Sequence, residues 1–464
     1  MGLLSEDAIA AFSSGSAVVL AVSGGSDSLA LLHLFAEWNG SCAAPIPTTE
    51  ISVVTVDHGL RPEARQEAAD VFTVASRLGF THTTLTWEAP KPEAGLMEAA
   101  RNARYRLMTE HCNRRFGRRR VLVATGHTRD DDVETFLMNL ARGSGIDGLS
   151  GIWSNRAIDR LNTHIRLVRP LIACRRSDLR AYLETRNESW VDDPTNADET
   201  FERSRLRAAL ATTGPGDDAV RGIETTMRRL REVQAAADQL VSKVDDELDA
   251  TSIPGLVAVL PWRGLADQPA YVGKRVLREK LAAYGGSAMG PSLKQIDAIW
   301  DKHIANVETA QRGLGGSHRS FQVTVAGCLI RGEPAGQGWI EICREPDRDV
   351  FPTMRLSPGT RAIWDRRFAI EVNENAATDI VVGPRHTAFW TDLQEKHTWR
   401  VGRSGPRPKL MTSALRGLPV ASGVGDTSQA LALPDPFRPL SGEDDIVQIR
   451  WLGSQAFEAG PSQS

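Results

Sequence analysis

One short segment near the start of the chain constrains the fold more than any other, because it joins an apolar run to an apolar helical pattern with almost no side chains between them. The segment reads VLAVSGGSDSLALLHLF over residues 19–35, and its centre consists of Ser23, Gly24, Gly25, Ser26, Asp27 and Ser28. A strand, a glycine turn and a helix N-terminus in this order expose backbone N–H groups and the positive end of the helix dipole. The segment therefore predicts a β/α unit with an anion site at the carboxyl end of its strand.

The anion that suits this loop is a phosphate group. Two glycines allow close approach, and three serines add hydroxyl donors. The first 242 residues contain a single lysine, Lys91, so the loop lacks the lysine of a Walker-type phosphate loop. Backbone amides without a lysine suit a leaving pyrophosphate, with magnesium completing the neutralisation. The alternative is an ordinary capped helix after a tight turn, with Ser26 or Asp27 as the N-cap.

Strand and helix patterns alternate over residues 16–210. Runs of β-branched residues predict strands at 17–22, 51–56, 82–87 and 121–125, and helical spacing predicts helices at 29–38, 63–78 and 97–116. This alternation indicates an α/β fold with a doubly wound parallel sheet. In such folds ligands bind at the carboxyl ends of the strands.

The length of the chain requires further domains, since a single core stops growing at roughly 250 to 300 residues and this chain has 464. We expect a first domain over 1–215, with TTGPGDD at 212–218 as the linker that follows it. A mostly helical middle domain is expected over 216–345, with short strands near its end. A small β-rich domain is expected over 346–464.

Composition narrows the class of protein. Hydrophobic residues make up 41% and charged residues 24%, which is ordinary for a globular protein. No window reaches the ~18 apolar residues of a membrane span, and the N-terminus lacks the basic start of a signal peptide, so we expect no membrane partner and a cytoplasmic location. The cysteines form no CxxC pair, which argues against a disulfide framework, a zinc ribbon or an iron–sulfur site; they are Cys42, Cys112, Cys174, Cys328 and Cys343.

Charge is informative through its distribution rather than its sum. The net charge is only −3, yet residues 101–120 carry eight arginines against one glutamate. Such a cluster could contact the phosphates of a nucleic acid. A GC-rich genome that favours arginine codons would explain it equally well.

Two further segments follow predicted strands. VTVDHGLRPEARQEA at 54–68 places Asp57 and His58 at a strand end, where either could line a nucleotide pocket or be an ordinary loop residue. GHTRDDDVETFLMNLARGSGIDGLSGI at 126–152 places Asp130, Asp131 and Glu134 on one side of a helix, with His127 just before its first turn. The same helix has an expected core stripe of Val133, Phe136, Leu137 and Leu140.

The acids of this helix have two interpretations. Acidic residues in a first turn can merely complement the helix dipole, which is worth ~0.3–1 kcal/mol each. An amine substrate would need such carboxylates for binding and deprotonation, because an amine with a pKa of ~10.4 is charged and non-nucleophilic at neutral pH. Three acids and a histidine beside a phosphate loop favour the second interpretation.

These motifs resemble a known family. SGGSDS is similar to the pyrophosphate loop of the N-type ATP pyrophosphatases, which activate a carbonyl oxygen as an adenylate. Residues 126–149 resemble the tRNA(Ile)-lysidine synthetase segment GHxxDDQxETxLxxLxRGSGxxGL, and EAARNARYRLM at 98–108 resembles its ARxxRY helix. LVRPLIACRRSDLRAYL at 167–183 and WVDDPTNADETFERSRLRAAL at 190–210 resemble two more of its segments.

Three positions depart from the family pattern. Asp132 replaces the usual Gln, Arg129 stands where a small or apolar residue is common, and Ser204 replaces an Asn. The first two leave the paired acids Asp130 and Asp131 in place. We therefore expect them to alter the local charge and not the chemistry.

The resemblance implies a mechanism and roles for individual residues. ATP would bind to residues 23–28 with Mg²⁺ near Asp27, and the adenine would lie near Asp57 and His58. The C2 oxygen of the wobble cytidine of an isoleucine tRNA with a CAU anticodon would be adenylated, and free L-lysine would then displace AMP. Asp131 would bind and deprotonate the lysine, and Arg104 would stabilise charge. The other residues expected to bind substrate are His127, Asp130, Glu134, Arg101, Arg142, Arg203 and Arg207.

Rival functions share parts of this pattern. A sulfur-inserting 2-thiocytidine enzyme would use the same loop but would want paired cysteines. A glutamine-dependent synthetase would bring a glutaminase nucleophile. A non-catalytic RNA-binding protein would not need the intact loop and acids. The oligomeric state stays open between a monomer and a homodimer.

Overall fold

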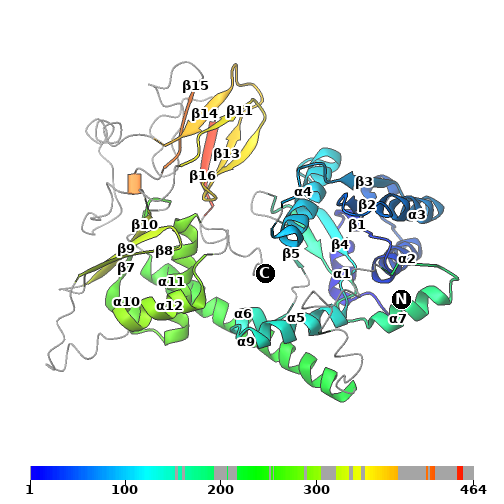
Figure 1. Cartoon of the computed structure of the whole chain (residues 1–464), viewed down its shortest axis with the longest axis horizontal. Helices are drawn as coiled ribbons and strands as arrows, with labels where there is room; N and C mark the ends of the chain where they lie inside the picture. The colour runs from blue at the N-terminus through cyan, green and yellow to red at the C-terminus, as the bar shows by residue number, and fades with distance from the viewer. Residues whose placement is uncertain are drawn as a thin grey trace. The chain divides into compact units, whose positions relative to one another are not determined.

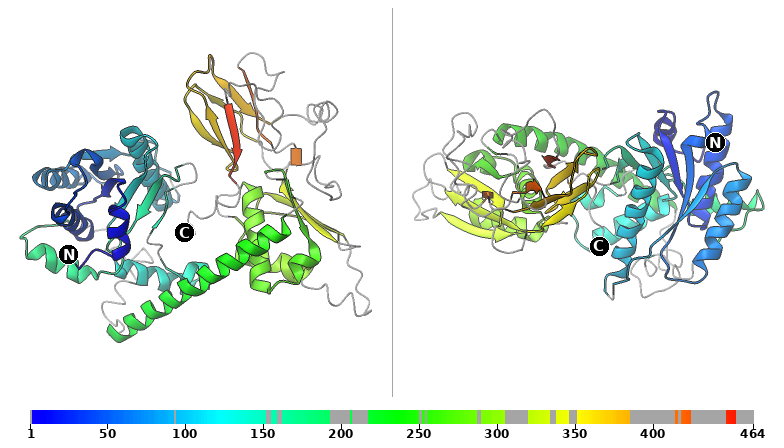
Figure 2. Two further views of the ribbon diagram at one scale, coloured as in Figure 1. Left: turned by 180° about the vertical axis from the view of Figure 1, so that it is seen from behind. Right: turned by 90° about the horizontal axis from the view of Figure 1, so that it is seen from above.

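The structure is a computed structural model of the whole chain (Figure 1). It describes residues 2–92, 94–151, 155–158, 162–192, 206, 217–249, 252–253, 255–286, 290–304, 320–333, 338–345, 351–384, 414–415, 418–423 and 447–452. Contacts divide the chain into two compact units, and the division falls between Gln234 and Ala235. This division lies inside helix α9 (Asp217–Leu248), which Figure 2 shows as one unbroken helix. The linker predicted at 212–218 lies almost entirely outside the described residues.

The first unit is built on a mixed six-stranded sheet. Its strand order is β3-β2-β1-β4-β6-β5, with β5 antiparallel to β6 and the other neighbours parallel. The strands are β1 (Ala17–Ala21), β2 (Ile51–Asp57), β3 (His82–Thr86), β4 (Val121–Thr125), β5 (Asn155–Ala157) and β6 (Ile165–Val168). The helices are α1 (Glu6–Phe12), α2 (Ser26–Ser41), η1 (Thr48–Glu50), α3 (Ala64–Arg77), α4 (Leu96–Phe116), α5 (Arg129–Ala141), α6 (Ile146–Leu149) and α7 (Arg176–Glu184).

Helices cover both faces of this sheet, and alternate residues of each strand point to opposite faces, so the strands contribute to a core on either side. Val18 and Leu20 of β1 belong to a core that includes residues of α1, α2, α3 and α7. Ala17 and Val19 belong to a second core, built with Met108 and other residues of α4. Figure 1 shows α2 and α3 on one side of the strands and α4 on the other. The expected doubly wound parallel sheet is therefore confirmed, with one antiparallel edge strand added.

The order of the strands fixes where the ligand site should lie. The chain runs outward from β1 to β2 and β3, and then returns to place β4 on the other side of β1. The crevice between the carboxyl ends of β1 and β4 is therefore the switch point at which open α/β sheets bind ligands. The loop 23–28 follows β1, and the acid segment follows β4.

The second unit combines helices with antiparallel sheets. A four-stranded sheet of order β7-β10-β9-β8 packs with α11 and α12, and two three-stranded sheets have the orders β11-β14-β15 and β12-β13-β16. The helices are α10 (Trp262–Ala266), α11 (Ala270–Gly285), α12 (Leu293–Ile299) and η3 (Trp300–Ile304). The strands are β7 (Val257–Pro261), β8 (Phe321–Val325), β9 (Cys328–Glu333), β10 (Trp339–Arg344), β11 (Met354–Leu356), β12 (Arg361–Trp364), β13 (Phe368–Val372), β14 (Ile380–Gly383), β15 (Val420–Gly423) and β16 (Val447–Trp451).

This second unit agrees with the expected helical segment followed by small sheets. β7 is an addition, since no strand was predicted near residue 257. It pairs with β10 and is buried along most of its length. Among the described helices of either unit, none is long and apolar enough to cross a bilayer.

Candidate active site

The loop after β1 is shaped by Ser28 and the two glycines. Gly24 has a φ of +90°, which side-chain-bearing residues rarely adopt. The Ser28 hydroxyl accepts a hydrogen bond from the Ser23 N–H at 3.1 Å and donates one to the Gly25 carbonyl at 2.9 Å. The Leu29 N–H donates to the Gly25 carbonyl, so α2 begins at once and its first N–H groups have no partner within the helix. The N-cap is Gly25, without a side-chain cap, and not the Ser26 or Asp27 of the capped-helix alternative.

The acid helix α5 begins with a capping box. Thr128 precedes its first residue and donates from its N–H to Asp131 Oδ2 at 2.8 Å and from its hydroxyl to the same oxygen at 3.0 Å. Asp131 is the third helical residue, the position from which an acidic or amide side chain can reach back to the N-cap. One carboxylate oxygen of Asp131 therefore stabilises the helix start, and its other oxygen faces elsewhere.

Arg176, the first residue of α7, joins the two segments. Its Nε donates to Asp27 Oδ2 at 2.8 Å, and a terminal nitrogen donates to Asp131 Oδ1 at 3.2 Å. Its other terminal nitrogen lies 3.9 Å from Glu134 Oε1. Its backbone N–H donates to Asp130 Oδ2 at 2.8 Å. The predicted site acids of the loop and the helix thus converge on one guanidinium.

Three carboxylates lie around the Arg176 guanidinium. Asp27, Asp131 and Glu134 surround Arg176, and the Glu134 residue is only 2% exposed. Burial raises the pKa of Asp27; the Arg176 charge opposes this and the Asp131 charge adds to it, and the net direction is upward. Burial alone would lower the pKa of Arg176, yet the carboxylates of Asp131 and Asp27 raise it above its ordinary value. The Arg176 guanidinium therefore stays charged.

Asp57 and His58 lie at the carboxyl end of β2, the strand that pairs with β1 on the side away from β4. The Asp57 carboxylate is buried and accepts the Gly59 N–H at 2.7 Å, so it shapes the turn. The His58 ring stands edge-on to Trp87 at 6.1 Å between centroids, and neither of its ring nitrogens has a hydrogen-bond partner. Burial lowers the pKa of His58 to about 4, and the nearby Arg104 charge contributes. His58 is therefore a neutral ring at physiological pH.

The remaining predicted site residues are placed unevenly. His127 lies directly after β4, and its Nδ1 is 2.8 Å from the Thr125 hydroxyl. Arg101 lies over the Tyr105 ring at 5.3 Å, while Arg104 and Arg142 are exposed. Arg203 and Arg207 lie outside the described residues.

One expectation about a single residue needs correction, and one site residue was not predicted. Leu140 was assigned to the core stripe of the acid helix but is 52% exposed; it lies in the last turn of α5, one residue before the helix ends. Arg176 was not singled out, although its segment was. The available signal was a pair of arginines at a helix start, where a positive charge opposes the dipole and so needs a nearby anion.

Magnesium is compatible with the donor set of the loop. Within the described part of the chain, no three His, Cys, Asp or Glu side chains gather into a metal cage of their own. Mg²⁺ commonly uses one or two carboxylates together with substrate phosphates and water, so a single loop carboxylate beside a phosphate cradle fits it. Asp27 supplies such a carboxylate, with Ser26 donating to its Oδ1 at 3.2 Å.

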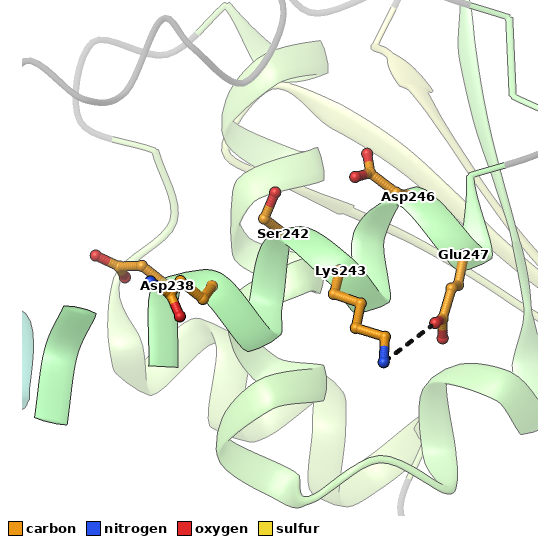
Figure 3. A pocket seen from close by; sticks show the side chains of 6 residues that line it. Asp238, Ser242, Lys243, Asp246 and Glu247 are labelled. Carbon is orange, nitrogen blue, oxygen red and sulfur yellow. Dashed lines mark ion pairs between the residues drawn. The ribbon is translucent and has the colours of Figure 1, made fainter. Parts of the chain in front are cut away.

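A shallow hollow on α9 in the second unit does not share these features. It is lined by Asp238, Gln239, Ser242, Lys243, Asp246 and Glu247. Figure 3 shows that its labelled side chains come from one helix, with the Lys243 ammonium turned toward the Glu247 carboxylate. None of the predicted site residues lines it.

Comparisons with known proteins identify the family of the chain. A family model described as a PP-loop domain matches residues 4–213. A tRNA(Ile)-lysidine synthase from Bradyrhizobium diazoefficiens is 39% identical over 346 residues, which is 72% of this chain and 91% of that protein. One from Methylobacterium nodulans is 40% identical over 336 residues, 71% of this chain and 91% of its own length. The solved U34-tRNA thiolase NcsA from Methanococcus maripaludis covers 49% of this chain and 76% of its own at 16% identity, and its TM-score of 0.37 is too low to be informative.

Proposed function

Because this chain belongs to the tRNA(Ile)-lysidine synthase family, we propose that it is an ATP-dependent carbon–nitrogen ligase that converts the wobble cytidine of a CAU-anticodon isoleucine tRNA to lysidine. The family resemblance drawn from the residue motifs is confirmed by relatives that match over most of their length. Free L-lysine, Mg²⁺ and the individual site residues belong to the proposal.

The observation that carries the proposal is the meeting of Asp27, Asp131 and Glu134 around Arg176 at the switch point of the sheet. A phosphate cradle alone would serve any ATP pyrophosphatase. The carboxylates gathered beside this cradle also offer anionic ligands for an ammonium group. An amine as the second substrate is what separates a lysidine synthase from its relatives that use sulfur or ammonia.

The first step forms the adenylate. The C2 oxygen of the cytidine attacks the α-phosphorus of ATP, and the bond to the β-phosphate oxygen breaks, so that pyrophosphate leaves. The N–H groups at the start of α2 stabilise the departing charge, as preorganised donors do. Mg²⁺ held by Asp27 would supply further neutralisation of the phosphates. The neutral His58 ring offers a flat surface and no competing positive charge beside the nucleotide.

The second step forms the new carbon–nitrogen bond. The lysine side-chain amine attacks C2, the bond from C2 to the adenylate oxygen breaks, and AMP leaves. The ammonium must first lose a proton, and we assign its binding and deprotonation to Asp131 with Asp130 and Glu134 beside it. Asp131 Oδ1 is already held by Arg176, so the incoming ammonium competes with this guanidinium. Arg104 is assigned to charge stabilisation and His127 to orientation of the substrate.

Sulfur insertion, the nearest rival, is disfavoured by the thiols. Cys112, Cys174, Cys328 and Cys343 are buried and unpaired, and Cys42 is half-buried. Burial raises the pKa of Cys112 to about 12 and that of Cys174 to about 11, so these thiols are poor nucleophiles.

The decisive experiment incubates the protein with ATP, labelled lysine and a CAU-anticodon isoleucine tRNA transcript. We expect label to enter the RNA only with ATP present, and AMP and pyrophosphate to form in equal amounts. A methionine tRNA transcript with the same anticodon is the matched control and should stay unlabelled. Entry of sulfur or of another amine in place of lysine would contradict the proposal.

Other assignments complete the proposal. The predicted domains at 216–345 and 346–464 are assigned to tRNA recognition, with Arg203 and Arg207 near the end of the first domain at 1–215. A cytoplasmic location follows from the tRNA substrate. A homodimer stays open and is tested by light scattering of the purified protein.

A further inference from the structure

The two residues of α5 that depart from the family motif both form ion pairs with the same helix. Arg129 pairs with Glu224, and Asp132 pairs with Arg231 at 2.6 Å. Glu224 and Arg231 are seven residues apart on the part of α9 that belongs to the first unit. Seven residues are about two helical turns, so both partners lie on one side of α9. We call these four residues the α9 clamp.

The Asp132–Arg231 pair is packed tightly. The Asp132 residue is 7% exposed, and the Arg231 Nε donates a second hydrogen bond to the Ser150 carbonyl at 2.6 Å. A Cβ on Gly151 would lie 2.4 Å from Asp132 Oδ1 and 2.8 Å from a terminal nitrogen of Arg231, and the φ of Gly151 is +80°. The pair therefore rests directly on the backbone, where only glycine fits. The Asp132 carboxylate is buried and the Arg231 side chain is partly exposed, so the contact is fixed mainly from the Asp132 side, unlike a pair in which both partners lie in solvent.

The clamp lies opposite the site acids on α5. At 100° per residue, Asp130, Asp131 and Glu134 fall within about 100° of the helix circumference. Arg129 and Asp132 are about 60° apart, and their mean direction is about 180° from that of the acids. The start of α5 is therefore held from both sides, by Arg176 on the acid side and by α9 on the clamp side.

Such a contact can act on the chemistry, because displacement of reacting groups by about 1 Å can reduce a rate ~10²-fold. We propose that Glu224 and Arg231 are positioning residues for the lysine step, acting through Arg129 and Asp132 to fix the direction in which Asp130 and Asp131 face the ammonium. The inference rests on the proposed function. It assigns a role to the two departures, which were expected to alter only local charge.

The test is a double-mutant cycle with Asp132→Gln, which restores the residue that the family motif carries, and Arg231→Gln. Each variant is assayed for tRNA-dependent pyrophosphate release and for the lysine concentration that gives half-maximal lysidine formation. We expect each single variant to raise that lysine concentration about 10-fold with pyrophosphate release within about twofold, and the double variant to be no worse than the worse single variant. A parallel cycle with Arg129→Gln and Glu224→Gln probes the second ion pair, in case loss of the Asp132–Arg231 pair prevents folding.

The control is Glu232→Gln, which removes an exposed pair with Arg228 on the same helix and should leave the lysine dependence unchanged. The inference would be overturned if the increases in the required lysine concentration caused by the two single substitutions multiplied in the double variant. It would also be overturned if the variants had a lowered melting temperature and an unchanged lysine dependence. If the wild-type protein forms no lysidine, both the proposed function and the inference are contradicted. If the wild-type protein is active but the effects of the two substitutions are independent, only the inference is contradicted.

Discussion

Two strand ends lie side by side at the switch point of the sheet, and they present opposite chemistry. The loop after β1 offers backbone N–H groups and one carboxylate, Asp27. The segment after β4 offers a row of carboxylates at the start of α5. The first suits groups that leave with negative charge, and the second suits a group that arrives with positive charge. Arg176 bridges the two through Asp27 and Asp131.

The difference shows how one fold can serve several chemistries. Backbone amides recognise phosphate whatever the side chains are, so the β1 end sets the use of ATP. The β4 end presents side chains instead of backbone groups, and we propose that these side chains set the second substrate. The predictions below either separate the two ends or show that they cannot be separated.

The largest effect is expected where the two ends touch. A Cβ on Gly126 would lie 2.9 Å from both the carbonyl carbon of Asp27 and the backbone nitrogen of Ser28. Gly126→Val should therefore push the acid segment off the loop and reduce both pyrophosphate release and lysine transfer by ~10³-fold or more, since misplacement by 1 Å alone costs ~10²-fold. Both activities are measured on variant protein of native helix content.

Gly40→Ala is the matched control for this substitution, because Gly40 lies in α2 with open space where its Cβ would be. It should be active and slightly more stable, as Ala is favoured over Gly in a helix by ~0.5–1 kcal/mol. Unchanged activity of Gly126→Val would mean that the two ends work independently.

Asp131→Asn should impair only the lysine step, which we assign to the β4 end. Lysine transfer is expected to fall ~10²-fold or more, the size of effect typical for loss of a group that transfers protons, while ATP binding is retained. Because Asp131 also caps α5, Thr128→Val is the control: it removes the hydroxyl that bonds to Asp131 and keeps the carboxylate. A wild-type rate of lysine transfer in Asp131→Asn would show that the acid is only a helix cap.

Arg176 should matter to both ends to an intermediate degree. Arg176→Met leaves Asp27, Asp131 and Glu134 to repel one another, and we expect both steps to slow by about 10- to 100-fold. Arg176→Lys keeps the charge but cannot reach three carboxylates at once, so a partial recovery is expected. The control is Arg180→Lys, because Arg180 lies on the same helix as Arg176 and pairs with Asp192 in solvent. Loss confined to one step would assign Arg176 to that end only.

Ser28→Ala should weaken only the binding of ATP, which we assign to the β1 end. The Ser28 hydroxyl joins the Ser23 N–H to the Gly25 carbonyl, and losing a hydrogen bond of ~1 kcal/mol should raise the KM for ATP about fivefold. The lysine dependence should not change. Ser41→Ala, at the other end of α2, should leave both unchanged. An equal rise in the lysine requirement would contradict the separation.

The smallest effect concerns pH. The folded pKa of His58 is about 4, against an ordinary value of 6.5, so the stability that comes from its neutral ring is present above pH 6.5 and is lost as the pH falls from 6.5 toward 4. In His58→Gln this part of the loss disappears. The fall in Tm between pH 7.5 and pH 5 should be smaller than in the wild type by ~1–2 °C in scanning calorimetry. If the fall in Tm were the same in His58→Gln and in the wild type, the His58 ring would be exposed to solvent and not buried.

Much of the first unit followed from local patterns. The strands predicted at 17–22, 51–56, 82–87 and 121–125 agree with β1 to β4 within a residue at either end. In β1, β2 and β4 both faces are buried, which leaves a continuous apolar signal, while the edge strand β3 was marked by its threonines. Helix ends were less certain. α2 begins at Ser26 rather than Leu29, since three polar residues at the loop belong to its first turn. β7 was missed because its five residues are a short apolar run without alternation.

The candidate site divides in the same way. The loop and the acids could be proposed from residue types and spacing, because each lies within one strand–helix connection. Arg176 could not be chosen among the arginines of its segment, since its contact with Asp27 spans 149 positions of the chain. The partners of Arg129 and Asp132 were out of reach for the same reason, as the Asp132–Arg231 contact spans 99 positions.

The sequence by itself therefore determined the phosphate loop, the acid helix and the alternation that makes a parallel sheet, because each depends on hydrogen bonds and apolar periodicity within about 30 residues. Only the tertiary structure decided which cation the acids meet and what holds their helix from behind. Ion pairs depend on the final positions of segments that are far apart in the sequence, and a charged residue type alone does not indicate which opposite charge it will meet.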